Sequence, residues 1–387
     1  MSSGTVNKQN NNNQRFDFGK SLTIVVMVLA VILLLSLVLI FYVSGKIDSM
    51  SNADTQIKLS AQGGFNCEYS EAQKLYPFGE GVLKVTNERI AYLTLSGNDI
   101  YSASVSYQNP QCVTFGEYAV VFDLDGYSFT MLTADNVLYS KPTVNQIKAV
   151  NVSSKGIAAV ITNSPDSYGQ VLLFDQNGSA ISEWSSYNSG YPLSCAFNDD
   201  STILAVSTLN TNGALVVPYI RQFSLTYGEK GIEVADRAVY STEDSVIFAS
   251  LFFVGEKLYC FTSDSIYQVS GDQIQQLNFD FAVVGRILKV KNNLFVTYSD
   301  GVSQMNKLAV INESNTVLYN SSIGSEINAV CTNGSLYAIS VNKRVFIYNA
   351  SGTVINDFSV DEDILRMNFI SGDKLCIVST SGVHTIN

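Results

Sequence analysis

The sequence predicts an all-β fold, an eight-bladed β-propeller preceded by one transmembrane helix. Three observations predict it. Residues 21–43 form one uninterrupted apolar segment, and the chain beyond about residue 65 consists of short β-like runs separated by Gly, Asn, Asp and Ser clusters. These runs repeat about every 40 residues, the period of a four-stranded propeller blade. With 46% hydrophobic and 15% charged residues, the chain has enough apolar side chains for a large core.

The N-terminal region divides into a tail, an apolar segment and a spacer. Residues 21–43, SLTIVVMVLAVILLLSLVLIFYV, contain no charge, proline or glycine. A helix needs about 20 such residues to cross a membrane. The segment is too uniformly apolar for a buried helix, and longer than the ~7–15 apolar residues of a cleaved signal peptide. We expect a disordered cytoplasmic tail over residues 1–20, a transmembrane helix over 21–43 and a juxtamembrane spacer over 44–64.

The positive charges beside the apolar segment favour one orientation. Lys8, Arg15 and Lys20 precede it, whereas only Lys46 and Lys58 follow closely. Positively charged flanks remain in the cytoplasm. We therefore expect a single-pass protein of the cell membrane, with the lipid bilayer around residues 21–43, a cytoplasmic N-terminus and an extracytoplasmic domain.

The repeat that predicts the propeller, over residues 65–387, is clearest near the C-terminus. Forty residues separate Ile287 from Ile327, and 38 separate Ile327 from Leu365. Apolar strands without strict alternation fit a propeller because neighbouring blades cover both faces of each blade. The first strands of eight units are expected to begin near Lys74, Gln111, Ile147, Tyr191, Ser245, Val283, Ser325 and Asp363. Seven blades are the alternative.

Two segments need special treatment in this division. The last unit supplies only three strands, so FNCEYS (65–70) is expected to pair as its fourth strand. That pairing would join the two ends of the domain and leave no open sheet edge. Residues 211–244 are long for the two strands that they must supply.

Turns such as FDQNG (174–178), VFDLDG (121–126) and IYNASG (347–352) carry an aromatic residue, then Asp or Asn, then Gly. Together with the layout, these turns resemble an uncharacterised family of single-pass membrane-anchored β-propeller proteins of Gram-positive bacteria. That family is similar to the quinoprotein-like (PQQ-like) and WD40-like propellers. The resemblance implies the fold and the topology but no activity. Quinone-binding repeats commonly carry a tryptophan, whereas Trp184 is alone in this chain, so no quinone cofactor is expected.

Charge and cysteine content narrow the classes of partner. The net charge of -11 repels phosphate backbones, so we expect no nucleic-acid partner. The six cysteines include no C-x-x-C pair and lie mostly in apolar runs. We interpret them as small buried hydrophobic residues, with a disulfide at Cys67 as the alternative.

Catalytic and metal-binding motifs are missing from the sequence. His384, the one histidine, falls in the predicted third strand of the last unit, where we expect a structural or surface role. The chain has no nucleotide-binding loop and no nucleophile-elbow motif. We predict no catalytic, cofactor-binding or metal-binding residue. The conspicuous carboxylates are interpreted as turn residues: Asp123, Asp125, Asp199, Asp200, Asp361, Glu362 and Asp363.

Two loops have the composition of a contact surface. SVSYQNP (104–110) and SSYNSGYP (185–192) combine Tyr with Asn and Ser. The candidate contact residues are Tyr107, Asn109, Tyr187, Asn188 and Tyr191. We expect a non-catalytic module that binds or scaffolds envelope proteins. The alternatives are a module that binds cell-wall glycan and a hydrolase that uses carboxylates in the central channel.

Overall fold

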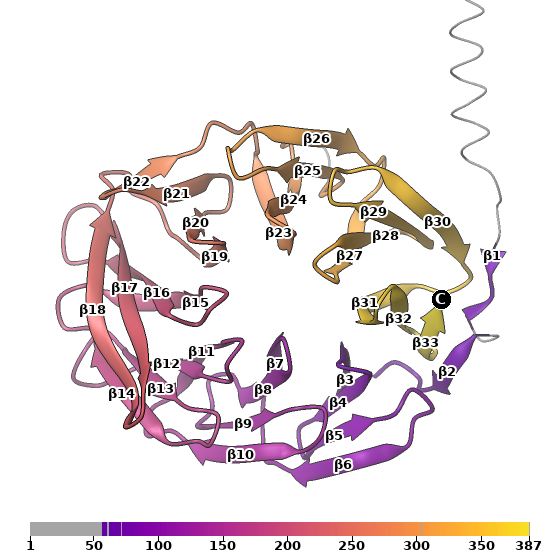
Figure 1. The fold of residues 1–387 in the computed structure, drawn as a ribbon, viewed down its shortest axis with the longest axis horizontal. Coiled ribbons are helices and arrows are strands. Elements are labelled where there is room, and N and C mark those ends of the chain that lie inside the picture. The colour runs from indigo at the N-terminus through magenta and orange to yellow at the C-terminus, as the bar shows by residue number, and fades with distance from the viewer. Residues whose placement is uncertain (1–55, 60–61, 71, 303, 387) are drawn as a thin grey trace, which may run out of the picture. The chain divides into compact units, whose positions relative to one another are not determined.

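A computed structural model describes residues 56–387, except 60–61, 71, 303 and 387. Its strands, β1 to β33, form eight sheets arranged in a ring (Figure 1). Each sheet is an antiparallel meander of four strands, and one of them gains a fifth. The fold is an eight-bladed β-propeller.

Each blade runs from the centre of the ring to its rim. The innermost strands are β3 (Gln73–Phe78), β7 (Pro110–Phe115), β11 (Ile147–Val152), β15 (Tyr191–Phe197), β19 (Ser250–Val254), β23 (Val283–Val290), β27 (Ile327–Thr332) and β31 (Ile364–Ser371). The second strands are β4 (Gly81–Thr86), β8 (Tyr118–Asp123), β12 (Ala158–Thr162), β16 (Ile203–Asn210), β20 (Lys257–Phe261), β24 (Asn293–Ser299), β28 (Leu336–Val341) and β32 (Lys374–Ser379). The third strands are β5 (Arg89–Leu93), β9 (Ser128–Leu132), β13 (Gln170–Phe174), β17 (Val217–Gly228), β21 (Ile266–Ser270), β25 (Lys307–Ile311), β29 (Arg344–Asn349) and β33 (Gly382–Ile386). The rim strands are β6 (Asp99–Ser104), β10 (Val137–Pro142), β14 (Ala180–Ser185), β18 (Gly231–Ser241), β22 (Gln273–Gln276), β26 (Val317–Ser322), β30 (Val354–Val360) and β2 (Gly63–Asn66).

The antiparallel order gives the propeller two distinct faces. All innermost strands begin on one face, which we call the amino face, and end on the other, the carboxyl face. The connections into each innermost strand and the turns between second and third strands lie on the amino face. The remaining turns lie on the carboxyl face.

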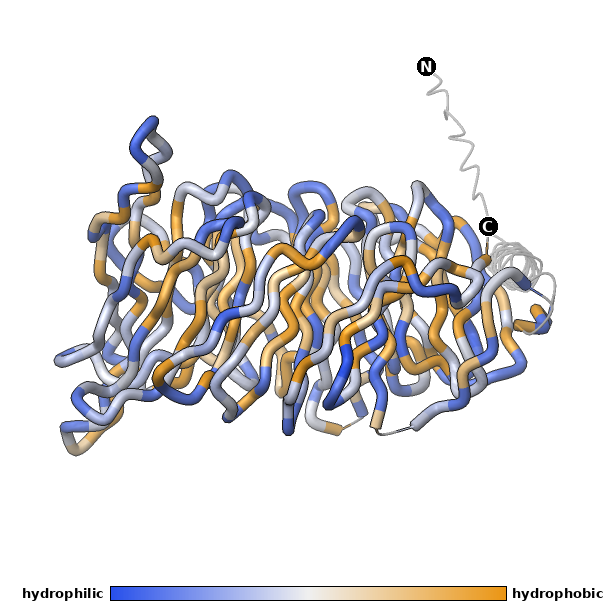
Figure 2. The backbone as a smooth tube through the Cα atoms, turned by 90° about the horizontal axis from the view of Figure 1, so that it is seen from below, coloured by the Kyte–Doolittle hydropathy of each residue, from blue (hydrophilic) through white to orange (hydrophobic). Residues whose placement is uncertain are grey.

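Burial follows the position of a strand within its blade. Second strands such as β12 and β28 are buried almost throughout because blades pack against both of their faces. Rim strands such as β6 and β26 alternate between exposed and half-buried residues. Figure 2 shows apolar positions concentrated in the strands and hydrophilic positions at the turns of both faces. The core is therefore a series of apolar layers between neighbouring blades.

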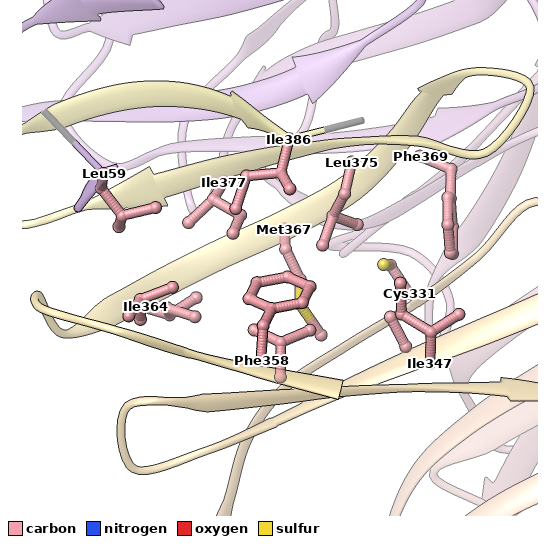
Figure 3. Packing of buried hydrophobic residues seen from close by; sticks show 13 residues of the cluster. Leu59, Cys331, Ile347, Phe358, Ile364, Met367, Phe369, Leu375, Ile377 and Ile386 are labelled. Carbon is pink, nitrogen blue, oxygen red and sulfur yellow. The ribbon is translucent and has the colours of Figure 1, made fainter. Parts of the chain in front are cut away.

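The ring closes through a strap at the N-terminal end of the domain. β2 pairs antiparallel with β33 and completes the last blade. β1 (Gln56–Ile57) pairs parallel with β30 at the rim of blade seven. Between them, Leu59 is fully buried, and its N–H donates to a carboxylate oxygen of Asp361 at 2.9 Å. Figure 3 shows Leu59 in the apolar layer between these two blades, with Phe358, Ile364, Met367 and Ile377.

The sequence-based division is largely confirmed. Eight blades are present, the segment that begins near Phe65 closes the last blade, and most innermost strands begin within two residues of the predicted starts. Blade five differs, because β19 begins at Ser250 and not near Ser245. Residues 211–244 do supply two strands, which form the long hairpin of β17 and β18.

Two other expectations meet the structure differently. The predicted tail and transmembrane helix, residues 1–43, lie outside the described residues, as does most of the spacer. In the described part of the chain, no helical segment has the length and apolar character of a membrane span. All six cysteines are free thiols, so the disulfide alternative at Cys67 is wrong; Cys195, Cys260, Cys331 and Cys376 are buried.

Candidate functional site: the central channel and the amino face

Two adjoining cavities, of about 510 and 720 Å³, lie among the innermost strands. They share the lining residues Thr114, Leu288, Thr332 and Asn368, so they form one continuous channel. The smaller cavity is lined by earlier residues of these strands and lies nearer the amino face. The larger one is lined by later residues of all eight strands. Both volumes fall in the range of about 300–1,000 Å³ that is typical of small-molecule sites.

The charged residues of the eight innermost strands all have one sign. These strands contain no Asp or Glu, and their charged residues are Lys74, Lys148, Arg286, Lys289 and Arg366. The chain as a whole carries a net charge of -11. The innermost strands are therefore cationic within an acidic molecule.

Two of these five cations are paired with carboxylates. Lys148 donates to Asp125 at 2.7 Å. Lys289 forms an ion pair with Asp199, which reaches it from the turn after β15. These pairs neutralise part of the positive charge of the innermost strands.

The other three cations have no carboxylate partner within the described residues. The guanidinium carbon of Arg366 lies 4.5 Å from the centre of the Tyr76 ring, a cation–π contact. The Lys74 ammonium donates to the carbonyl oxygen of Pro110 at 2.9 Å. Burial and the nearby charge of Arg366 lower the pKa of Lys74. The Arg286 side chain is exposed in the smaller cavity, and in the described part of the chain its guanidinium has no hydrogen-bond or ion-pair partner.

The larger cavity has an apolar aromatic lining. The later residues of the innermost strands contribute Phe78, Phe115, Phe197, Phe252 and Phe369 to it. The channel therefore combines a cationic part near the amino face with an apolar part near the carboxyl face.

A second polar cluster surrounds the single histidine. His384 lies in β33, the third strand of the last blade as predicted, and is buried, with 2% of its surface exposed. Its Nε2 lies 3.0 Å from the Ser379 hydroxyl and 3.8 Å from the Glu362 carboxylate. Ser379 also donates to Glu362 at 2.5 Å, and Ser381 donates to the same oxygen. Burial raises the pKa of Glu362, but these hydroxyl hydrogen bonds and His384 outweigh it, so the net pKa lies below the ordinary value.

This cluster lacks the order of a nucleophile–base–acid triad. A nucleophilic serine passes its proton to the imidazole, which a carboxylate holds through the other ring nitrogen. Here the serine proton points to Glu362, and both neighbours face the same nitrogen, Nε2. We assign the cluster to the closure of the last blade.

The amino face carries most of the large apolar side chains that the described domain exposes at its turns. Val302 is 94% exposed, Val144 92%, Leu215 67% and Tyr187 65%. The full set on this face is Tyr69, Tyr127, Val144, Tyr187, Tyr191, Leu215, Ile247, Val283 and Val302. On the carboxyl face of the described domain, the comparable side chains lie at strand ends and none is more than 52% exposed: Ile100, Phe115, Tyr227, Val317, Leu318, Val354 and Ile355.

The sequence-predicted contact loops both lie on the amino face, but their residues differ in exposure. Tyr187 and Asn188 are exposed, and the Tyr191 ring packs edge-on against Tyr168 at 5.0 Å. Asn109 is also exposed. Tyr107 is 3% exposed and its hydroxyl is 2.9 Å from that of Thr130, so this ring has no surface to offer a partner. It serves the packing of blades one and two.

The carboxylates interpreted as turn residues lie in turns and connections, except Asp123, which is the last residue of β8. Asp125 has a positive φ of 62° in the turn between β8 and β9. Asp123 is buried at the end of β8 and accepts hydrogen bonds from the N–H groups of Gln108 and Asn109. Asp199 and Asp200 follow β15, and residues 361–363 precede β31. In the described part of the chain, no three His, Cys, Asp or Glu side chains gather as a metal site would require.

Comparisons with known proteins agree with this architecture. Residues 55–387 match a family of unknown function, DUF5711. No curated protein shows significant similarity to the chain.

Solved structures share the fold at low sequence identity. BamB from Moraxella catarrhalis is 14% identical, with 86% of this chain and 96% of that chain covered and a TM-score of 0.50. Sqt1 from Chaetomium thermophilum is 12% identical over 84% and 97%, with a TM-score of 0.54. Apo AztD from Citrobacter koseri is 11% identical over 77% and 86%, with a TM-score of 0.51. Identities this low establish a common propeller fold alone.

Proposed function

The chain belongs to DUF5711, a family of unknown function, and from its geometry we propose that it is a non-catalytic protein-binding or scaffolding module. It contacts its partner with the amino face. The observation that carries this proposal is the concentration of exposed apolar side chains on that face, Tyr187 and Leu215 among them. Apolar and tyrosine-rich centres with a polar rim are the usual anatomy of protein interfaces.

The charges of the amino face indicate which charge the partner surface should carry. Lys343 is the one basic residue in its described connections. The exposed acidic residues there are Glu68, Glu88, Asp125, Asp166, Glu243, Asp244, Asp264, Asp280, Asp300, Glu326 and Asp363. Complementarity then requires a partner surface with an apolar centre and a basic rim.

We place this module on the outer side of the cell membrane, held by residues 21–43. The length and apolarity of that segment and the excess of Lys and Arg before it support this placement. The partner is accordingly an envelope protein. Protease added to intact cells whose wall has been removed should digest the propeller. Complete protection of the propeller in intact cells, with digestion after lysis, would overturn the orientation.

The binding face is tested with paired variants of the full-length chain. Complexes are purified from membranes in a non-ionic detergent. Tyr187→Ser combined with Leu215→Ser should lose the partner, whereas Phe115→Ser on the carboxyl face should retain it. The recovered partner, purified separately, should then bind wild type directly. Equal recovery by both variants would contradict the assignment of the amino face.

Binding of cell-wall glycan is the second candidate. It is favoured by the exposed Tyr187 and by the Tyr168–Tyr191 ring pair beside Asn188, since such rings can stack on sugars. Saturable binding of wall polysaccharide that Tyr187→Ser abolishes would favour this candidate over a protein partner.

The innermost strands give no support to a carboxylate-based hydrolase in the channel. Such enzymes need two acidic side chains about 5–9.5 Å apart. The eight strands contain neither Asp nor Glu, and the one carboxylate among the described residues that line the two cavities, Asp199, is paired with Lys289. The non-catalytic proposal is tested by a panel of hydrolase substrates that includes glycans. Turnover that resists removal of contaminants would contradict it.

A further inference from the structure

We propose that the cationic part of the channel, lined by Arg286 and Arg366, binds the carboxylate or phosphate group of a small organic anion. Both arginines line the 510 Å³ cavity, from blades six and eight, with β27 of blade seven between them. This proposal rests on the channel alone and is independent of the protein-binding role of the amino face.

The two guanidinium groups have the chemistry that such a site requires. A guanidinium is always charged and presents a planar fork of N–H donors that matches carboxylate and phosphate oxygens. The Tyr76 ring holds the Arg366 group in place, and its one hydrogen bond within the described residues is a long one, 3.4 Å, to the carbonyl oxygen of Leu75. Most donors of Arg366 and all those of the Arg286 guanidinium therefore remain available.

The surroundings of Arg366 are short of negative charge. The described residues that line the cavity around Arg366 include no Asp or Glu, and burial together with the charge of Arg366 lowers the pKa of Lys74. Elsewhere on the innermost strands, Lys148 and Lys289 each have an aspartate partner. An anion bound beside Arg366 would do for this group what Asp125 and Asp199 do for those lysines.

The remainder of the channel limits the size and shape of the ligand. Phe115, Phe197 and Phe252 line the adjoining cavity, so an apolar part of the ligand can extend toward the carboxyl face. The acidic exterior repels long polyanions, because part of such a molecule would have to lie against the surface of the domain. A small anion inside the channel avoids that surface. The ligand class is therefore a small amphiphilic anion.

The test uses the full-length chain in a non-ionic detergent at low ionic strength. Phenylphosphate and benzoate are titrated by calorimetry, and the two probes distinguish a phosphate from a carboxylate ligand. At least one should bind saturably with a Kd of about 1 mM or tighter. Arg286→Gln and Arg366→Gln should each weaken the binding of that probe by about tenfold or more, because each variant loses a charge-assisted hydrogen bond.

Arg237→Gln, on the exposed rim strand β18, removes the same charge outside the channel and should leave binding unchanged. Failure of both probes to saturate would overturn the proposal. So would unchanged affinity in the two channel variants, or equal weakening by Arg237→Gln. If Arg366→Gln does not fold, Arg286→Gln decides, because Arg286 is exposed and its guanidinium has no hydrogen-bond or ion-pair partner within the described residues.

Discussion

The two faces of this propeller are built from equivalent connections but use them differently. Polar side chains satisfy turns on both faces: Asp175 and Asn349 on the carboxyl face, and Thr86 and Thr262 on the amino face, each accept two hydrogen bonds from backbone N–H groups nearby. On the amino face, Tyr187 and Leu215 extend into solvent. The antiparallel fold requires turns on both faces but exposed apolar side chains on neither. Turn geometry therefore accounts for the polar side chains of both faces but not for Tyr187 and Leu215, for which we propose a partner.

The largest expected effect on stability is at the closure of the ring. The other stability changes predicted for the two faces can be compared with it. Leu59→Ala removes a fully buried side chain from the layer between blades seven and eight. It should lower the free energy of unfolding by about 2–5 kcal/mol. Denaturant unfolding of the two proteins measures it.

Leu215→Ala is the matched control, because the same side chain is removed from a position that is 67% exposed. It should leave stability nearly unchanged. Equal losses in the two variants would show that the strap does not close the ring as described.

A pair of asparagines compares the faces directly. Asn198 is buried on the carboxyl face, and its side-chain oxygen accepts from the N–H groups of Thr202 and Ile203, both at 2.9 Å. Asn198→Ala leaves these donors without their acceptor and should cost about 1–3 kcal/mol. Asn188 is exposed on the amino face, so Asn188→Ala should cost much less. Similar losses of melting temperature would remove the contrast between the faces.

Glu362 lies beside the amino face, but we assign it a role in the closure of the last blade and not in binding a partner. The pKa of its carboxyl is lower in the folded protein than its ordinary value of 4.5. A group of this kind stabilises the protein above its unfolded pKa and loses that contribution as pH falls through its folded pKa. Wild type should therefore lose stability on acidification below about pH 4.5.

Glu362→Gln should be less stable at neutral pH and should lose less stability between neutral and acid pH. Asp363→Asn, at the exposed neighbouring carboxylate, is the control. Urea unfolding at a series of pH values gives both slopes, and an unchanged slope in Glu362→Gln would contradict the assigned role.

The smallest effect on stability is expected on the amino face itself. Tyr187→Ser combined with Leu215→Ser should change the free energy of unfolding by no more than about 0.5 kcal/mol. A thermal melt checks this. A large loss of stability would mean that these side chains serve the fold and would weaken the argument for a partner.

The blade repeat could be predicted because each strand and turn of an antiparallel blade has a recognisable local sequence pattern. Alternating apolar strands and polar turns placed seven of the eight blade starts within two residues. The predicted start of blade five was wrong for a physical reason. Residues 245–249 are apolar like a strand, but Phe248 is buried in the layer beside Leu251 without belonging to β19. An apolar sequence indicates burial, and in this segment a residue can be buried without being paired in a strand.

The candidate site was only partly predictable. The turn composition located the loops with Tyr187 and Tyr191, but it could not show that the Tyr107 ring turns inward. Arg286 and Arg366 were missed because they line one cavity only when the ring closes. A signal existed nevertheless: once the innermost strands are assigned, their charged residues are all basic. The cluster of Ser379 and Glu362 around His384 left no such pattern.

The most direct test of the protein-binding claim is site-specific photo-crosslinking in living cells. A photoreactive amino acid replaces Tyr187 or Leu215 on the amino face, or Phe115 or Tyr227 on the carboxyl face. The account predicts a crosslink to one defined protein from both amino-face positions, and none from the carboxyl-face positions. Crosslinks to that protein from the carboxyl face alone, or no protein crosslink from either face, would contradict it.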